Sequence, residues 1–343
     1  MEQSMNFIFK LLAPCRPLQL VIAALVLILA SCSAPKQKKE DQSLEIITAP
    51  LIPAPSFNPD SAFKFTAEQV AFGPRIPGTP AHKKCAAYLV QKLESFDWNV
   101  QVQKGVVQTY DKKKFELANI IAQYQPSRPV RYLLCAHWDT RPFADRDTLN
   151  PDKPFDGAND GASSTAVLLE IARQFSMHHP DIGVDIILFD IEDYGDKSGK
   201  VSDSWCLGSQ YWSKNPHQPG YFARFGILLD MVGARDAVFP KEGTSLRYAP
   251  AIVNKVWTIA REKGFSRYFI ESSIQETIDD HLYVNQLANI PCIDIVHYDV
   301  NTMDYMPCHH RHCDNMDIID PETLFAVGQV VLEVLYSELN TVK

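Results

Sequence analysis

The chain reads Tyr132-Leu133-Leu134-Cys135-Ala136 and continues directly into His137-Trp138-Asp139. Five apolar residues in a row, without polar alternation, are typical of a strand covered on both faces of a sheet. Three further runs of this kind span residues 185–189, 225–229 and 291–296. Residues 98–103 alternate instead, which predicts a half-buried edge strand. Together these runs predict a sheet with a buried centre.

Helical patterns occupy the segments between the predicted strands. They span residues 162–175, 250–263, 280–287 and 321–339. Strands that alternate with helices are typical of a sheet with helices on both faces. We therefore predict an α/β fold with a central, twisted, mixed and mostly parallel sheet.

Polar side chains lie just past the ends of the three central runs. They are His137 and Asp139, Glu192 and Asp193, and Asp230. Ligands of open α/β sheets bind outside the carboxyl ends of the strands, so we expect these groups to converge on one crevice. Asp160 begins the helix that follows the first run, and His309-His310-Arg311-His312 lies in a loop before the last helix.

Imidazole nitrogens and carboxylate oxygens are the ligands of many catalytic zinc sites, which keep one position open for water or substrate. Each residue also has a structural interpretation: Asp160 could cap a helix, Asp230 could end a strand, and His310 could be a surface residue. Glu192 and Asp193 follow a run that should be buried, where unpaired acids are costly unless a metal compensates them. The combination of these groups predicts a metal centre.

The composition limits the possible partners. The 343 residues carry a formal net charge of −8. Because the chain has no surplus of basic residues to neutralise phosphates, its composition argues against nucleic-acid binding.

The first 31 residues differ from the rest. Lys10 and Arg16 precede an apolar run over 18–30, which is too short to cross a bilayer and reads as a signal peptide. The run ends in Leu29-Ala30-Ser31-Cys32, which resembles a bacterial lipobox. We therefore expect Cys32 to be lipidated, residues 32–60 to form a flexible tether, and residues 61–343 to form one catalytic domain. This organisation predicts an exported bacterial lipoprotein on the periplasmic face of a membrane, with the outer membrane favoured.

The remaining cysteines are too few for a disulfide scaffold. Some could pair in an oxidising compartment, and Cys308 and Cys313 are the first candidates. The sequence leaves this pairing open, and it leaves the oligomeric state open, with a monomer favoured.

Several short motifs carry a resemblance. Their order and spacing resemble those of animal-type glutaminyl cyclases. The motifs are Arg75-Ile76-Pro77-Gly78-Thr79, the run ending in His137-Trp138-Asp139, Gly157-Ala158-Asn159-Asp160, the run over 188–193, the run over 228–234 and Asp279-Asp280-His281. These enzymes are a branch of the zinc-aminopeptidase superfamily. The resemblance implies a zinc-aminopeptidase-like fold and a glutaminyl-peptide cyclotransferase that converts N-terminal glutamine of peptides and secreted proteins to pyroglutamate and releases ammonia.

The resemblance also implies roles for individual residues. One Zn²⁺ per chain would be held by Asp160, Asp193 and His310, with His312 as the fallback ligand. Glu192 would be the general acid/base, and Asp230 and Asp279 would form an acidic network near the reacting nitrogen. The expected pocket and supporting residues are His137, Asp139, Trp138, Trp205, Asp280 and His281. For both tryptophans, ordinary core packing is an open alternative.

Five positions depart from the family pattern. Asp193 stands where the family has Glu, His309 where it has Trp, and Arg311 where it has Thr. Ala136 and Thr165 occupy the positions of the animal enzymes' disulfide. These departures predict a substrate pocket that differs in detail from the family's.

Two other functions fit parts of the sequence. His137, Asp160, Asp193, Asp230 and His310 match all five ligand positions of two-zinc aminopeptidases of the same superfamily. A catalytically inactive lipoprotein that binds peptide N-termini would keep the fold without the chemistry. The sequence around Asp230 and Asp279 favours the cyclase.

Overall fold

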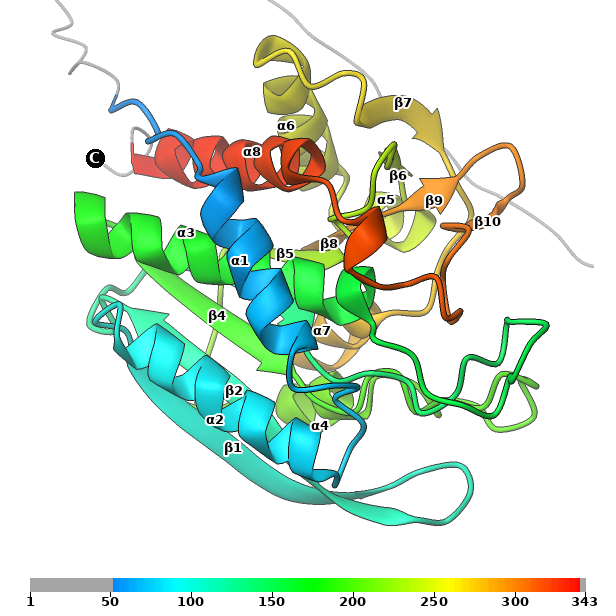
Figure 1. The fold of residues 1–343 in the computed structure, drawn as a ribbon. Coiled ribbons are helices and arrows are strands. Elements are labelled where there is room, and N and C mark those ends of the chain that lie inside the picture. Colours follow the sequence, from blue (N-terminus) through cyan, green and yellow to red (C-terminus); the bar gives the residue numbers. More distant parts are fainter. Residues whose placement is uncertain (1–51, 340–343) are drawn as a thin grey trace, which may run out of the picture. The chain divides into compact units, whose positions relative to one another are not determined.

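A six-stranded mixed sheet forms the centre of the computed structural model, which describes residues 52–339 (Figure 1). The strand order is β1-β2-β4-β3-β5-β8. The four neighbouring strands β4, β3, β5 and β8 run parallel to one another, whereas β2 runs antiparallel to β1 and β4. The predicted mixed and mostly parallel sheet is therefore confirmed.

The strands of the main sheet are β1 (Asn99–Gln108), β2 (Lys114–Tyr124), β3 (Arg131–His137), β4 (Gly183–Phe189), β5 (Gly226–Asp230) and β8 (Cys292–Val296). Two small sheets pair β6 (Phe239–Lys241) with β7 (Phe269–Ser273) and β9 (Tyr298–Asp299) with β10 (Asp304–Tyr305). The helices are α1 (Pro59–Val70), α2 (Pro80–Glu94), α3 (Ser164–His178), α4 (Leu207–Lys214), α5 (Gly243–Tyr248), α6 (Pro250–Glu262), α7 (Asp280–Ala288) and α8 (Pro321–Leu339), with a π turn η1 (Ala158–Ser163) and a 3-10 turn η2 (Met316–Ile318).

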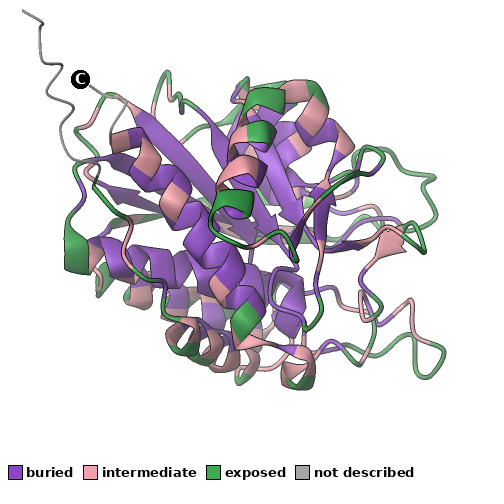
Figure 2. Ribbon diagram, turned by 90° about the horizontal axis from the view of Figure 1, so that it is seen from above, coloured by how far each residue is buried: buried purple, intermediate pink, exposed green. Residues whose placement is uncertain are grey.

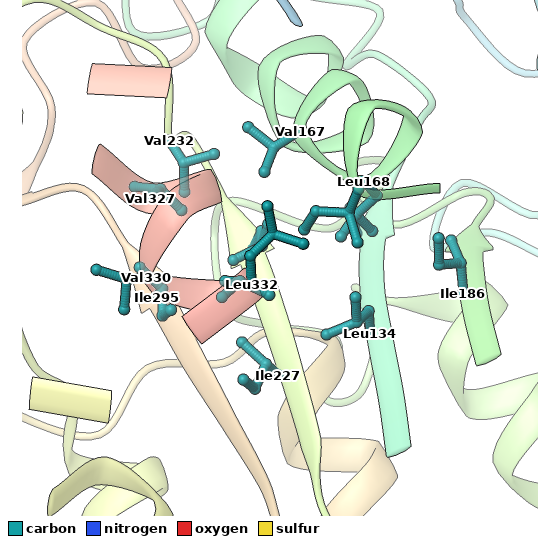
Figure 3. Close-up of a cluster of buried hydrophobic side chains, with 14 of the residues drawn as sticks. Leu134, Val167, Leu168, Ile186, Ile227, Val232, Ile295, Val327, Val330 and Leu332 are labelled. Carbon is teal, nitrogen blue, oxygen red and sulfur yellow. The ribbon is translucent and has the colours of Figure 1, made fainter. Parts of the chain in front are cut away.

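The larger core lies between the sheet and a layer of helices that includes α1, α3 and α8. Leu134 on β3, Ile227 on β5 and Ile295 on β8 point into this layer, where they meet Leu168 of α3 and Val330 of α8 (Figure 3). Alternate residues of a strand face opposite sides of a sheet, so the intervening residues must be covered separately.

The opposite face of the sheet packs against α4 and α7. Leu133 and Cys135 of β3 lie there with Trp212 of α4 and Val284 of α7. Because both faces are covered, the central strands are buried along their whole length (Figure 2). This burial explains why these strands read as continuous apolar runs.

The predicted helices and strands appear close to their expected bounds. The run over 250–263 becomes α6, the run over 280–287 becomes α7, and the run over 321–339 is α8. The alternating segment at 98–103 is the first half of the edge strand β1, which continues to Gln108.

The two N-terminal helices, α1 and α2, are less apolar than α3 and α8 but have clear start signals. Asn58 and Thr79 cap them through their side chains, and each cap is followed by proline at the first helical position. Phe57 just before α1 is buried in the core, so the packed chain includes a few residues before Ser61.

The signal peptide, Cys32 and most of the tether lie outside the described residues, and these predictions stay predictions. Among helices within residues 52–339, none is long and apolar enough to cross a membrane.

Candidate active site

The predicted polar groups meet in one cavity of about 630 Å³ at the carboxyl ends of the central strands. Asp230 is the last residue of β5, and Glu192 and Asp193 follow β4. Asp160 lies in η1, Asp279 caps α7, and His310 lies in the loop before α8. All six line the cavity.

Two carboxylates each keep one oxygen bound and one oxygen free. Asp160 Oδ1 lies 2.9 Å from His137 Nε2, and Asp193 Oδ2 accepts from the Arg141 backbone N–H at 3.1 Å. The other oxygens, Asp160 Oδ2 and Asp193 Oδ1, are buried without a hydrogen-bond partner. They lie 3.7 Å and 3.0 Å from His310 Nε2.

This donor set fits the metal that the sequence predicts. Two unpartnered carboxylate oxygens and one imidazole nitrogen converge, and buried polar atoms without partners are costly. Three N and O donors with an open fourth position are the usual protein ligands of catalytic zinc. Burial lowers the pKa of His310 to about 3, so its imidazole is neutral, as a metal ligand must be.

The structure separates the two candidate histidine ligands. His310 is buried and faces Asp160 and Asp193. The His312 imidazole lies 3.2 Å from the Asn150 carbonyl oxygen and does not line the cavity. The His310 loop is closed by a disulfide between Cys308 and Cys313, the pair that the sequence left open.

The loop that carries Asp160 is held from two sides. The buried guanidinium of Arg75 donates to the carbonyl oxygens of Asp156 and Gly157. Asp314 accepts from the backbone N–H groups of Asn159 and Asp160 at 2.7 and 3.2 Å. A Cβ on Gly161 would lie 2.5 Å from the His137 carbonyl oxygen, so glycine permits this close approach.

Asp139 orients the two acids after β4. Its carboxylate accepts from the backbone N–H groups of Glu192 and Asp193 at 3.0 and 3.3 Å. Arg141 also donates to the Asp193 carbonyl oxygen at 3.0 Å. Asp139 is therefore a supporting residue rather than a ligand.

His137 lies in the middle of the acids. Its Nε2 is 2.9 Å from Asp160 and 3.2 Å from Asp230, and its Nδ1 is 3.6 Å from Asp139. Burial disfavours the imidazolium, but the interactions with these three carboxylates outweigh burial and hold the His137 pKa well above its usual value. His137 thereby links the metal-facing acids to Asp230.

A second acidic group borders the donor set. Oxygens of Glu192 and Asp279 and the Cys206 sulfur lie within 4.8 Å of one another. Burial is the main reason that the pKa of Glu192 is well above its usual value, and it also raises the pKa of Asp279 to about 7 and that of Asp230 to about 6. Carboxyl groups with such pKa values can exchange protons near neutral pH.

The four remaining predicted pocket residues differ in their positions. Trp205 lines the cavity and stacks on His310 with ring centroids 6.1 Å apart. Trp138 is fully buried against His82, so the core alternative holds for it. His281 is buried against Glu242, and Asp280 is buried behind Asp279 without a hydrogen-bond partner for its carboxylate.

Sequence reasoning missed Arg75, Arg141 and Asp314 as supports of the site and Cys206 as a neighbour of Glu192. Arg75 lies in one of the motifs that carry the resemblance and Asp314 lies four residues after His310, but their contacts with distant backbone groups leave no periodic signal. A buried arginine can be recognised only when the fold is known.

An open α/β sheet with a zinc donor set at its strand ends defines the class of the protein as a zinc-exopeptidase-type enzyme. The model of peptidase family M28 matches residues 119–335. A solved structure of a Zn-dependent exopeptidase from Parabacteroides distasonis is 49% identical to the chain, with a TM-score of 0.81, and the match covers 83% of this chain and 99% of that one.

Two glutaminyl cyclases give the finer placement. The solved glutaminyl cyclase of Tannerella forsythia is 50% identical, with a TM-score of 0.80, over 82% of this chain and 99% of that one. A glutaminyl-peptide cyclotransferase of Drosophila melanogaster is 25% identical over 273 residues, which are 73% of each chain. The chain belongs to peptidase family M28 and, within it, to the glutaminyl cyclases.

Proposed function

We propose that the chain is a zinc-dependent glutaminyl cyclase that converts the N-terminal glutamine of peptides and proteins to pyroglutamate and ammonia. The observation that carries this proposal is the pair of the partly buried Glu192 and the buried Asp279, which lies beside the donor set and takes no part in it. Cyclisation needs acids that accept a proton from the attacking α-amine and return it to the leaving nitrogen.

Asp160, Asp193 and His310 would hold one Zn²⁺, which supplies Lewis-acid polarisation of the substrate γ-carbonyl group when it is bound. Glu192 takes the proton from the α-amine as the amine nitrogen attacks the carbonyl carbon of the side-chain amide. Glu192 then returns that proton to the departing amide nitrogen, which leaves as ammonia. Both reacting groups belong to one glutamine residue, so the protein contributes mainly by holding them in the reactive geometry.

Asp230 and Asp279 orient and share protons around this transfer. Burial raises both pKa values towards neutral, and charge repulsion from Asp230 adds to the rise at Asp279. A neutral carboxylic acid at Asp279 can donate a hydrogen bond, whereas an ionised one can accept the amine proton. Trp205 forms an aromatic wall of the cavity next to His310.

A peptide that begins with glutamine, incubated with the full-length protein, tests the proposal. We expect loss of one ammonia per peptide with every peptide bond intact, abolition by a chelator and restoration by zinc. Release of free glutamine would instead establish an aminopeptidase. The absence of both products would favour a peptide-binding protein.

The second candidate, a two-zinc aminopeptidase, is favoured by one observation. Ligand atoms of His137, Asp160 and Asp230 lie within 4.8 Å of one another and offer a second donor set next to the first. The 49% identical exopeptidase structure agrees with this function. Metal analysis separates the candidates, because the cyclase is expected to hold one zinc per chain and the peptidase two.

The proposal includes the setting of the enzyme. A lipid on Cys32 would anchor a monomeric catalytic domain to the periplasmic face of a bacterial membrane, where exported proteins with N-terminal glutamine are the substrates. The lipobox-like Leu29-Ala30-Ser31-Cys32 supports this arrangement.

A further inference from the structure

The thiol of Cys206 lies against the carboxylate of Glu192. We propose that Cys206 is a positioning residue that holds the Glu192 carboxylate in place for proton transfer by donating a hydrogen bond to it. This inference rests on the proposed function, because it assigns Glu192 a role in turnover. Cys206 does not line the cavity, so it acts through Glu192 and does not touch the substrate.

The hydrogen bond joins Cys206 Sγ to Glu192 Oε1 at 3.3 Å. Within residues 52–339 no other side chain hydrogen bonds to this carboxylate, and the nearest cationic atom, His137 Nδ1, is 3.9 Å from Oε2. A glutamate side chain has several rotatable bonds, and burial in one rotamer requires a contact that selects it. The thiol occupies one oxygen and leaves Oε2 free to exchange protons.

Backbone contacts hold the two side chains together. The Cys206 N–H donates to the Glu192 carbonyl oxygen at 2.8 Å, and the Leu207 N–H donates to the Ile191 carbonyl oxygen at 3.0 Å. A Cβ on Gly208 would lie 2.1 Å from the Asp190 carbonyl oxygen, so glycine lets the start of α4 approach the segment after β4. These contacts keep the backbones of Glu192 and Cys206 adjacent, which places the thiol within reach of the carboxylate.

Both residues that set this geometry have strained backbones. Ile191 has a φ of +54° and Cys206 a φ of +58°, a region that is costly for a β-branched residue and uncommon for any residue except glycine. Such conformations persist where the surroundings fix them, and they concentrate at functional sites. Here the turn at Ile191 directs Glu192 into the cavity, and the turn at Cys206 brings the thiol back to it.

The thiol is a donor rather than an anion. Burial, together with the nearby charges of Glu192, Asp280 and Asp279, raises the Cys206 pKa well above its usual value. A neutral thiol is a hydrogen-bond donor, and the acceptor within reach of Cys206 is the Glu192 carboxylate oxygen.

Variants at position 206 test the inference in the zinc-loaded full-length enzyme. Cys206→Ala removes the donor, and Cys206→Ser keeps one. Cys85→Ala removes another buried thiol from α2, far along the chain from the acids, and serves as the matched control. We expect Cys206→Ala to lower kcat about tenfold with KM and zinc content near wild type, because a misplacement of about 1 Å can cost on the order of 10²-fold in rate.

The serine variant decides between positioning and packing. Recovery of kcat by Cys206→Ser to within about threefold of wild type supports a hydrogen bond, since the hydroxyl is also a donor. Equal losses in the Ala and Ser variants, or a kcat for Cys206→Ala within about twofold of wild type, would overturn the inference. A similar loss in Cys85→Ala would also count against it.

An infrared measurement tests the hydrogen bond between Cys206 and Glu192 directly. It requires neither turnover nor a variant of Cys206. The infrared S–H stretching band of a thiol shifts when its acceptor changes. We expect Glu192→Gln to shift one S–H band of the wild-type spectrum, and an unchanged spectrum would refute the hydrogen bond. If Glu192→Gln shifts the band but the wild-type protein forms no pyroglutamate, the result counts against the proposed function instead.

Discussion

Glu192 is the residue on which the proposed chemistry depends most directly. Replacing it with glutamine keeps the size of the side chain and removes its ability to accept and return a proton. We expect Glu192→Gln to lower kcat by about 10²–10⁴-fold, the usual contribution of general acid/base catalysis, with zinc retained. Steady-state rates together with metal analysis check this prediction.

The exposed Glu116 on β2 provides the control, because Glu116→Gln makes the same chemical change outside the cavity. Activity of Glu192→Gln within about twofold of wild type would remove Glu192 from the proposed role.

His310 and His312 form a matched pair for testing the donor set. Loss of residues that merely support a ligand costs about 10–100-fold in metal affinity, so His310→Ala should weaken zinc binding by at least about 100-fold. His312→Ala should bind zinc like the wild type, because its imidazole lies outside the cavity. Competition with a chromogenic chelator measures both affinities, and a larger effect at His312 would reverse the assignment.

Several of the predicted site residues lie at strand ends. Glu192, Asp193 and Asp230 follow apolar strands, and the topology alone brings such positions together. Arg75 and Asp314 were missed because they act on backbone groups of a distant loop. For Trp138 the sequence left pocket wall and core open, because a large aromatic residue next to a site residue has no sequence feature that distinguishes the two.

At the scale of elements, helix α7 begins with the buried carboxyl group of Asp279, whose pKa burial raises to about 7 from a usual value of 3.8. The folded protein therefore keeps this proton when the unfolded chain has lost it. The free energy of unfolding contributed by this group falls as pH rises from about 4 to about 7. Asp279→Asn removes this loss and keeps an acceptor for the helix cap.

We expect metal-free Asp279→Asn to gain stability over the wild type above about pH 7, by at most about 4 kcal/mol, and to match it below about pH 4. Chemical denaturation at both pH values measures the difference. Asp236→Asn, at an exposed ion pair, should show no such dependence. A gain of equal size at both pH values would contradict the assigned pKa.

The loop that presents His310 is closed by the Cys308–Cys313 disulfide. Closing a loop of this length restricts the unfolded chain by about 2 kcal/mol in the chain-entropy description. We expect the double variant Cys308→Ser, Cys313→Ser to lose about that much stability and also to bind zinc more weakly, because His310 lies between the two cysteines.

Denaturant unfolding of metal-free protein and chelator competition separate these two effects. The single variant Cys292→Ser, at a free buried cysteine of β8, controls for loss of a thiol. Unchanged zinc affinity in the double variant would show that the loop holds its shape without the disulfide.

Elements with long apolar segments were predictable, and elements with more polar sequences were less so. The buried strands β3, β4 and β5 and the helix α8 have long apolar patterns. Helices α1 and α2 begin with a cap and a proline but have mixed faces, and α4 follows an irregular loop. Their helical state depends on tertiary packing more than on sequence period.

For the whole molecule, the setting of the enzyme is tested at Cys32. If its sulfur carries a lipid, full-length wild-type protein should stay with the membrane fraction after carbonate washing, and Cys32→Ala should be released. Cys85→Ala should behave like the wild type, because Cys85 is buried in the catalytic domain. Retention of Cys32→Ala in the membrane would contradict the anchor.

The three proposed metal donors are widely spaced along the chain, at positions 160, 193 and 310. During synthesis they become available in that order, and the imidazole comes last. Until residue 310 has emerged, the chain has two carboxylates and no third donor. Asp314, which fixes the loop of Asp160, emerges later still. An incomplete chain therefore lacks both the ligand and its support, and a nascent molecule cannot modify its neighbours before nearly all of its catalytic domain has been made.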